Sequence, residues 1–391
     1  MSVPSENMAK ASMTACQVSL LTPEGRGAVA TVSLCGPRAV AHASALFVAA
    51  TGIPLEQFPT DRVVFGRWCE DGQVGEDVVV CCRGQDHVEV HCHGGRVAAR
   101  TIINSLVARG CRAVPWRELA TARAEDAIEA EARIALAAAP TERCAAILLD
   151  QLRGALRSAL LTIRRGIDIG NIDDARRHLT ELLSHSDVGL HLTRPWDVVL
   201  TGHANVGKSS LINALLGYQR CIVYEQPGTT RDVITAHTAC DGWPVRLADT
   251  AGLRCADDAI EAEGVRLARR RLAAADAIVL VFDASEAWTD EDEVLYRQWP
   301  HAIVVHNKCD AAVPAEDNRP PGLATCALDG RGVEQLILHL ARHLVPSPPA
   351  EGTAVSFTGR HITGLRAILA ALDEGSPESA NAILGELWAR Q

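Results

Sequence analysis

The stretch 198–210, which reads VVLTGHANVGKSS, constrains the fold of this chain more than any other part of the sequence. Gly202, Gly207, Lys208 and Ser209 fit the pattern G-x-x-x-x-G-K-[ST] of a phosphate-binding loop. The glycines let successive backbone N–H groups turn toward an anion, and the start of the following helix adds partial positive charge. In such a loop the lysine reaches the β- and γ-phosphates and the serine hydroxyl is a ligand of Mg²⁺.

The pattern is short and arises by chance, so its weight depends on a strand before it and a helix after it. Residues 198–200 are an apolar run typical of a buried strand, and residues 209–216 predict a helix that stops at Gly217. Further apolar runs alternate with helical stretches, which favours a doubly wound parallel sheet in an α/β domain. These runs lie at 245–248, 277–282 and 302–305.

Two segments after this loop suit the γ-phosphate and its magnesium ion. Asp249, at the end of the predicted strand 245–248, begins the sequence DTAG, in which the carboxylate can hold Mg²⁺ through water. The backbone N–H of Gly252 can meet the γ-phosphate. The segment 227–232, PGTTRD, lies where a switch loop belongs, and Thr230 supplies a second hydroxyl for Mg²⁺.

Two later segments suit guanine. The sequence NKCD, residues 307–310, follows a predicted strand, and the Asp310 carboxylate can accept hydrogen bonds from the N1–H and 2-amino groups of guanine. Adenine lacks these donors and would leave the carboxylate unpaired. The segment TCA, residues 325–327, lies where a backbone N–H contacts the guanine O6. Each segment alone could be a turn or a polar strand end, but four signatures in this order predict a guanine-nucleotide site.

The predicted GTP contacts come from all of these segments: Asn205, Val206, Gly207, Lys208, Ser209, Ser210, Gly228, Thr229, Thr230, Asp249, Thr250, Ala251, Gly252, Asn307, Lys308, Asp310, Cys326 and Ala327.

Composition narrows the function classes. The 391 residues carry a formal net charge of -10, which argues against a generally basic protein that coats nucleic acid and leaves room for a local basic face. The 13 cysteines are odd in number and scattered, and no secretory signal opens the chain, so we expect reduced thiols and a cytoplasmic location. No apolar run reaches membrane-spanning length, so no membrane association is expected.

The remaining segments indicate further domains around the nucleotide domain. Residues before 115 mix strand-like runs at 27–34, 63–68, 76–82 and 87–91 with helical stretches at 38–50 and 97–109, which predicts an α+β module. Helical patterns follow the module and return after the nucleotide domain, as if that domain were inserted into a helical one. The expected domains are 1–115, α+β; 116–195, helical; 196–345, nucleotide-binding; and 346–391, helical.

Several of these segments resemble the tRNA modification GTPase family MnmE, also named TrmE. The similarity lies in residues 202–216, 228–232 and 249–254, and extends to TPEGRG at 22–27, EVHCHGG at 89–95 and 122–127. It implies a Ras-like nucleotide domain within a helical domain, preceded by a small folate-binding-like domain that dimerises. It also implies action on tRNA wobble uridines with a flavin-containing partner protein and 5-formyl-tetrahydrofolate as one-carbon donor.

The resemblance also implies how GTP is hydrolysed. Leu253 stands where a Ras-type protein has a water-orienting glutamine. The family instead uses K⁺, here with Asn205 and Thr229 as ligands together with the backbone carbonyls of Tyr224 and Gln226, in a site completed by G-domain association. Glu261 falls at the position of the family's water-orienting glutamate, and a solvated carboxylate at a helix start is the alternative. The expected catalytic residues are therefore Glu261, Lys208 and Thr230.

The one-carbon site departs from the family pattern. Ser33 stands at the position of an arginine and Glu118 at that of a lysine, whereas Glu89 matches the family's folate-contacting glutamate. The printed chain also ends without the family's carboxy-terminal cysteine motif. We therefore expect intact nucleotide chemistry and doubtful folate binding. Two functions stay open: a K⁺-stimulated GTPase of tRNA modification, or a GTP-switched regulatory protein that has lost the one-carbon chemistry.

A group of histidines near Glu89 has two explanations. His87, His91 and His93 alternate with Cys92 and other residues, so His91 and His93 share one strand face while Cys92 points away. A strand followed by a turn explains the group better than zinc, because no C-x-x-C pair accompanies it.

Overall fold

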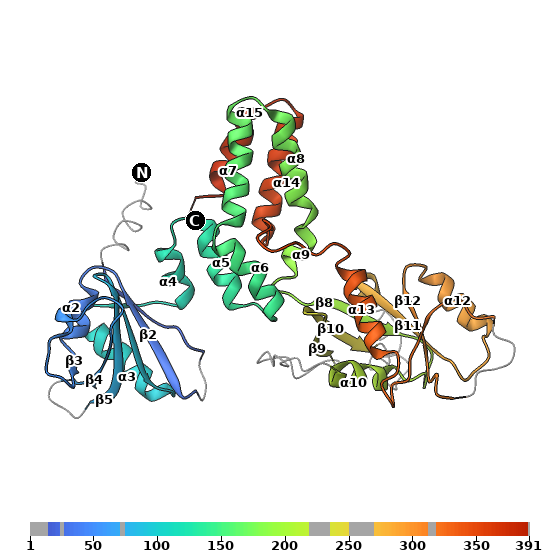
Figure 1. The fold of residues 1–391 in the computed structure, drawn as a ribbon, viewed down its shortest axis with the longest axis horizontal. Coiled ribbons are helices and arrows are strands. Elements are labelled where there is room, and N and C mark those ends of the chain that lie inside the picture. Colours follow the sequence, from blue (N-terminus) through green and yellow to red (C-terminus); the bar gives the residue numbers. More distant parts are fainter. Residues whose placement is uncertain are drawn as a thin grey trace, which may run out of the picture. The chain divides into compact units, whose positions relative to one another are not determined.

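The computed structural model describes residues 15–23, 27–70, 75–218, 235–249, 270–311 and 318–389. The described chain forms two compact units, residues 1–125 and 126–391. Figure 1 shows the elements of each.

The first unit is built on a seven-stranded sheet with the strand order β3-β4-β5-β6-β2-β1-β7. Neighbouring strands are antiparallel, except that β7 runs parallel to β1. The strands are β1 Gln17–Leu20, β2 Val29–Cys35, β3 Phe47–Ala49, β4 Val63–Trp68, β5 Glu76–Gly84, β6 His87–His93 and β7 Arg112–Ala113. The helices are α2 Ala39–Ser44, η1 Leu55–Gln57, α3 Arg96–Ala108 and α4 Trp116–Arg123.

Alternation along the strands gives this sheet one apolar and one polar face. Val32, Val88 and Val90 are fully buried and form one core with Ile102 and Leu106 of α3. The residues between them on β2 and β6 point to the opposite face, as the strand period of two requires. The polar face therefore carries Ser33 of β2, which pairs in register with Glu89 of β6.

The prediction of a helix over 38–50 is wrong beyond residue 44. Helix α2 ends at Ser44, and the strand β3 begins at Phe47 and pairs with β4. Phe47 and Ala49 are buried whereas Val48 between them is 58% exposed, which is the alternation of a half-buried strand. Pairing with a strand that lies later in the chain thus overrides the local helical preference.

In the second unit, helices from both sides of the nucleotide domain form one helical layer. Figure 1 shows α7 and α8 beside α14 and α15, and α14 packs on α8 while α15 packs on α7. Gln151 joins the two parts of the chain, because its side chain donates to the Thr353 carbonyl and accepts from the Val355 N–H, both at 3.0 Å. The helices are α5 Ala127–Ala137, α6 Glu142–Leu152, α7 Ala155–Asp168, α8 Ile172–Ser184, α9 Ser186–Leu190, α14 Gly359–Asp373 and α15 Pro377–Glu386.

The nucleotide domain contains a six-stranded sheet with the order β13-β12-β11-β8-β10-β9. Its α/β class and helical insertion confirm the expected fold, with one correction. Strand β9 runs antiparallel to β10, because the turn at Asp241 and Gly242, with φ of 48° and 81°, folds the chain straight back. The elements are β8 Trp196–Thr201, α10 Lys208–Tyr218, β9 Thr235–Cys240, β10 Trp243–Asp249, β11 Ala277–Asp283, α12 Asp290–Gln298, β12 Ile303–Asn307, β13 Leu323–Ala324 and α13 Val333–Leu344.

Helix α10 starts one residue before the predicted helix and runs through Gly217, which was expected to end it. Within the described ranges, no helix has the length and apolar character needed to cross a membrane.

Candidate functional site

The phosphate loop joins the buried strand β8 to α10, as its sequence predicts. Gly202, Asn205 and Gly207 adopt positive φ angles of 148°, 65° and 94°, so the loop turns tightly before the helix begins. A Cβ atom on Gly202 would lie 2.1 Å from the Val281 carbonyl oxygen, and one on Gly207 would lie 2.3 Å from Nδ2 of Asn307. Glycine is therefore required at both positions by the close approach of β11 and β12.

The two side chains that follow the loop are held at its mouth. Lys208 is 5% exposed, and its Nζ donates to the carbonyls of Gly202 at 3.0 Å and His203 at 2.6 Å. The Ser209 hydroxyl donates to Oδ2 of Asp249 at 2.7 Å. The structure thus brings together two predicted Mg²⁺ ligands that lie 40 residues apart. Hydroxyl and carboxylate oxygens are ligands that Mg²⁺ prefers, so these residues fit the ion.

Asn307, at the end of β12, ties the phosphate loop to the predicted guanine loop. Its side chain is 1% exposed, and Nδ2 donates to the Val206 carbonyl at 2.9 Å. Its Oδ1 accepts from the hydroxyl of Thr325 and from the N–H of Ala327, both at 3.2 Å. Since each of its polar atoms is used, Asn307 fixes the spacing between the two loops.

A second strand-end carboxylate supports the guanine loop, and sequence reasoning missed it. Lys308 has a positive φ of 63°, and its Nζ donates to Oδ2 of Asp283 at 2.5 Å. Ser285 donates to the other carboxylate oxygen through its N–H and its hydroxyl. Burial raises the pKa of Asp283, but the bonds from Lys308 and Ser285 outweigh burial and hold the pKa below its ordinary value. Its position at the end of the apolar run that forms β11 could have identified Asp283 as a candidate site residue.

Cys326 lies behind the predicted guanine-binding carboxylate. It is 1% exposed, and burial together with a hydrogen bond to Asp310 raises the pKa of its thiol. The thiol therefore stays protonated beside the carboxylates of Asp310 and Asp329. The backbone N–H of Cys309 donates to the Thr325 carbonyl at 3.0 Å, so the two guanine segments also join through the backbone.

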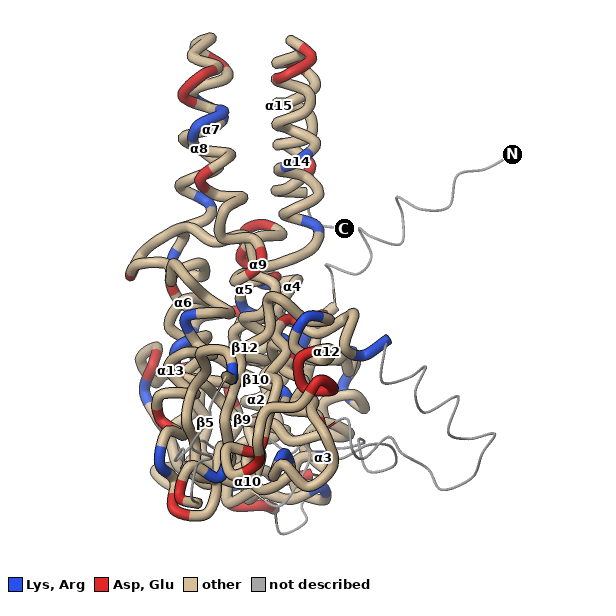
Figure 2. Tube along the Cα trace, turned by 90° about the vertical axis from the view of Figure 1, so that its right-hand side faces the viewer, with Lys and Arg blue, Asp and Glu red and all other residues tan. Residues whose placement is uncertain are grey.

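The first helix turn beside the phosphate loop is acidic. Figure 2 shows this turn of α12, and its carboxylates are Asp290, Glu291, Asp292 and Glu293. Asp292 completes a capping box with Thr289, and its Oδ1 lies 3.3 Å from Nε2 of His203 in the phosphate loop.

Other predicted site residues lie outside the described residues: Tyr224, Gln226, Gly228, Thr229, Thr230, Thr250, Ala251, Gly252, Leu253 and Glu261. The structure places the remainder of the predicted GTP contacts at one end of the sheet, around the carboxyl ends of β8, β10 and β12.

Comparison with known proteins agrees with this geometry. Residues 197–308 match the family model described as 50S ribosome-binding GTPase, and residues 17–118 match that of the GTP-binding protein TrmE N-terminus. The tRNA modification GTPase MnmE of Geobacillus thermodenitrificans is 34% identical across 81% of this chain and 79% of its own. That of Geobacillus kaustophilus is 33% identical across 92% of this chain and 90% of its own.

The chain belongs to the MnmE family of tRNA modification GTPases. As a member it is a GTP hydrolase that binds GTP and Mg²⁺ through its P-loop domain. Among solved structures, Era of Aquifex aeolicus is 26% identical, covering 44% of this chain and 66% of its own, with a TM-score of 0.30.

The first unit of this MnmE family member carries Glu89 on the polar face of its sheet. The Glu89 carboxylate accepts from Nε of Arg83 at 3.0 Å. Next to it, Ser33 is fully buried and lies 3.1 Å from Nε2 of His87, while Arg123 donates to Nδ1 of His87 at 3.1 Å. A second nitrogen of the Arg123 guanidinium lies 3.3 Å from Nε2 of His87, so Arg123 and Ser33 both contact this ring.

This arrangement differs from the folate site that the family resemblance implies. Burial, reinforced by the charge of Arg123, lowers the pKa of His87 to about 4, so the ring is neutral at physiological pH. One oxygen of Glu89, Oε2, accepts from Arg83, and the carboxylate lies 3.8 Å from His87 and His91, so a ligand that takes both oxygens has to displace Arg83. Glu118, at the family's lysine position, pairs with Arg112 at the exposed edge of the unit.

Proposed function

We propose that this protein hydrolyses GTP with the groups gathered at the phosphate loop, and that K⁺ stimulates the reaction. The observation that carries the proposal is the convergence of Lys208, Ser209 and Asp249 at the mouth of a preformed loop. On GTP binding, Lys208 exchanges its two carbonyl partners for β- and γ-phosphate oxygens. Ser209 and Asp249 would hold Mg²⁺, and the ion would supply positive charge to the same oxygens.

Further roles follow from family membership. Asn205, whose backbone has the positive φ of the loop, is assigned to K⁺, with Thr229 and the carbonyls of Tyr224 and Gln226. A cation there stabilises charge that grows between the β- and γ-phosphates. Glu261 orients the attacking water, and Thr230 completes the magnesium shell. We further propose that two G domains associate to close this site.

The substrate beyond GTP is proposed from the relatives. Their names describe tRNA modification GTPases, and the chain covers 79–90% of the two compared above. We therefore propose that the GTP cycle serves modification of the tRNA wobble uridine in the cytoplasm, together with a flavin-containing partner protein.

A second function is supported by the polar face of the first unit. Ser33, His87 and Arg123 satisfy one another where the family's one-carbon donor is expected, and Glu89 is paired with Arg83. A protein with this face keeps the GTP cycle and does not use 5-formyl-tetrahydrofolate. It would then act as a GTP-switched regulatory protein.

Hydrolysis assays of the purified protein test the first proposal. We expect faster turnover in K⁺ than in Na⁺ at equal ionic strength, and loss of this difference in Asn205→Ala. Glu261→Ala should keep GTP affinity and slow turnover. Equal rates in K⁺ and Na⁺ for the wild type would refute the role of K⁺, and an unaltered rate in Glu261→Ala would return that residue to a solvated carboxylate.

Complementation separates the two functions. Wobble-uridine nucleosides are measured by mass spectrometry in tRNA from a bacterial strain that lacks its own family member, with and without this gene. Restored modification establishes the modification function. Absence of modification, with normal GTP hydrolysis by the expressed protein, supports the regulatory function.

A further inference from the structure

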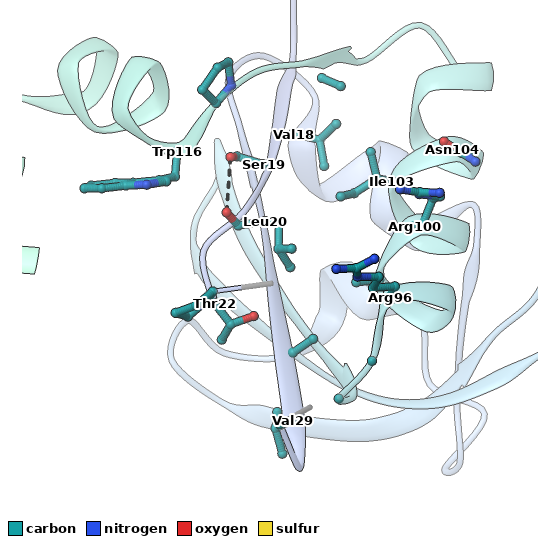
Figure 3. A pocket seen from close by; sticks show the side chains of 18 of the residues that line it. Val18, Ser19, Leu20, Thr22, Val29, Arg96, Arg100, Ile103, Asn104 and Trp116 are labelled. Carbon is teal, nitrogen blue, oxygen red and sulfur yellow. Dashed lines mark hydrogen bonds between the residues drawn. The ribbon is translucent and has the colours of Figure 1, made fainter. Parts of the chain in front are cut away.

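The first unit contains a cavity of about 570 Å³ that is lined by residues of α3 and of strands β1 and β2. Its inner wall is apolar and consists of Val18, Leu20, Ala30, Ala99 and Ile103. Its volume exceeds that of a simple anion and suits a ring system with a substituent. Figure 3 shows the cavity from close by.

Three polar side chains of one helix face line the same cavity. Arg96, Arg100 and Asn104 are spaced by four residues along α3, so they lie on one side of the helix. In Figure 3 the guanidinium group of Arg96 extends from the helix toward the strand that carries Val18 and Leu20, and Arg100 lies one turn further along the same helix. Within the described ranges neither arginine forms a hydrogen bond or an ion pair. The cavity therefore has an apolar wall and, beside it, two arginines that are not paired with a carboxylate in the described ranges.

Close backbone packing fixes the shape of the mouth of the cavity. The Gly94 N–H donates to the Ala28 carbonyl at 2.9 Å, and a Cβ atom on Gly94 would lie 1.7 Å from the Gly27 carbonyl oxygen. The backbone at Gly27 and Ala28 thus meets Gly94 at this point. Their close packing positions the first turn of α3, and with it Arg96, at the cavity.

Most of the cavity wall belongs to the apolar side of the sheet, and Ser19, which pairs in register with Ser33, also lines it. Val18 and Ala30 belong to the apolar face of the sheet, whereas Ser33 and Glu89 lie on the opposite face. Neither Ser33 nor Glu89 lines the cavity. The satisfied cluster on the polar face therefore leaves the cavity open to a different ligand.

We propose that this cavity binds a nucleotide of an RNA strand, with phosphate at Arg96 and Arg100 and the base against the apolar wall. The inference rests on the proposed action on tRNA. Arginine forks match phosphate geometry, and the Asn104 amide offers one donor group and one acceptor to a base edge. Because the whole chain carries a net charge of -10, RNA affinity must come from local cations such as this pair.

The test uses the full-length protein and a fluorescently labelled anticodon stem-loop RNA with uridine at the wobble position. Arg100→Glu and Arg96→Glu should each weaken binding about tenfold or more and reduce the slope of log affinity against log salt by about one. Arg109→Glu is the matched control, since it makes the same charge change at the end of the same helix and outside the cavity. It should alter affinity less than about threefold. GTP hydrolysis without RNA should be unchanged in all three variants.

Crosslinking places the base. With 4-thiouridine at the wobble position, irradiation should link RNA to the peptide 96–104 or to β1, and Ile103→Trp, which fills the cavity, should abolish that crosslink. Free uridine monophosphate as competitor distinguishes a mononucleotide ligand from a strand: competition at equal concentration would overturn the assignment to RNA.

Two other results would overturn the proposal while leaving the proposed function standing. RNA binding that all three charge reversals leave unaffected would place RNA elsewhere on the protein. Loss of the RNA crosslink in the presence of 5-formyl-tetrahydrofolate would assign the cavity to the one-carbon donor. Loss of wobble modification in the complementation assay, despite RNA binding at the cavity, would contradict the proposed modification function alone.

Discussion

The nucleotide site and the polar face of the first unit both gather charged and polar side chains on a sheet, but they do so in opposite ways. In the nucleotide site, Asn307 bonds to backbone groups of two loops, and Lys208 donates to the carbonyls of Gly202 and His203. On the polar face, Ser33, His87 and Arg123 bond to one another. The first arrangement holds two loops in place through their backbone groups, whereas in the second the polar side chains pair with one another.

The difference shows what a binding site needs beyond the right residue types. A ligand must replace existing partners at low cost, and a cation that leaves carbonyls for phosphates gains charge-assisted bonds. A ligand on the polar face would have to break the Glu89–Arg83 pair and leave Arg83 with Asp61 alone. Family resemblance at one glutamate therefore does not predict retained folate binding. The predictions that follow test this contrast.

The largest loss of GTP affinity is expected for Lys208→Ala. The variant loses the cation that faces both phosphates, and two charge-assisted bonds are worth about 3–6 kcal/mol, or a factor of 100 or more in affinity. Titration with a fluorescent GTP analogue measures it. Arg133→Ala, which removes an exposed ion pair of α5, serves as the control and should bind normally. GTP affinity within threefold of wild type would show that the loop does not hold the nucleotide as described.

The polar face should respond to pH through His87. Its folded pKa of about 4 lies below the ordinary value of 6.5, so between these values the unfolded chain binds the proton more readily. The contribution of His87 to the free energy of unfolding is therefore fully present above pH 6.5. It falls by about 3 kcal/mol as the pH approaches 4.

Hydrogen exchange of the β2 and β6 amides measures this loss, comparing wild type with His87→Gln at each pH so that intrinsic rates cancel. The variant should keep its protection as the pH falls from 7 to 5, whereas the wild type loses part of its protection. Parallel behaviour of the two proteins would mean that His87 is not held neutral by its neighbours.

Much of the nucleotide site could be predicted from the sequence because its geometry is local. The glycines, lysine and serine of the loop are consecutive, and the strand before them is a short apolar run, so pattern and backbone geometry coincide. Motif order along an α/β chain also determines which strand ends meet at the sheet edge. The contact of Ser209 with Asp249 follows from that rule.

What the sequence did not predict depends on distant partners. Strand β3 forms because β4 pairs with it, and Asp283 matters because Lys308 lies 25 residues later. Ser33 and His87 are 54 residues apart, so no local pattern shows that they satisfy each other. The Asp241–Gly242 turn carried a local signal for a hairpin that was not used.

Asn307→Ala tests whether the hydrogen bonds that join the phosphate loop to the guanine loop contribute to GTP binding. The change leaves the Val206 carbonyl and the Thr325 hydroxyl without their partner, at about 1–3 kcal/mol. GTP affinity should fall roughly tenfold and the melting temperature should fall as well. Thr325→Val removes one of these bonds and keeps the contact with Val206, so its effect should be smaller. Equal effects of the two variants would show that the tie to the phosphate loop is unimportant.

The smallest effect is expected for Asp283→Asn. Lys308 then keeps a neutral acceptor of the same shape, and the loss of charge assistance costs about 1 kcal/mol, or less than tenfold in GTP affinity. Calorimetric titration with GDP and GTP should show equal losses, because Lys308 lies at the guanine end of the site. Arg297→Ala, which breaks an exposed ion pair of α12, is the matched control. A loss confined to GTP would instead place the Asp283 effect at the γ-phosphate, and a loss above a hundredfold would make this carboxylate as important as Lys208.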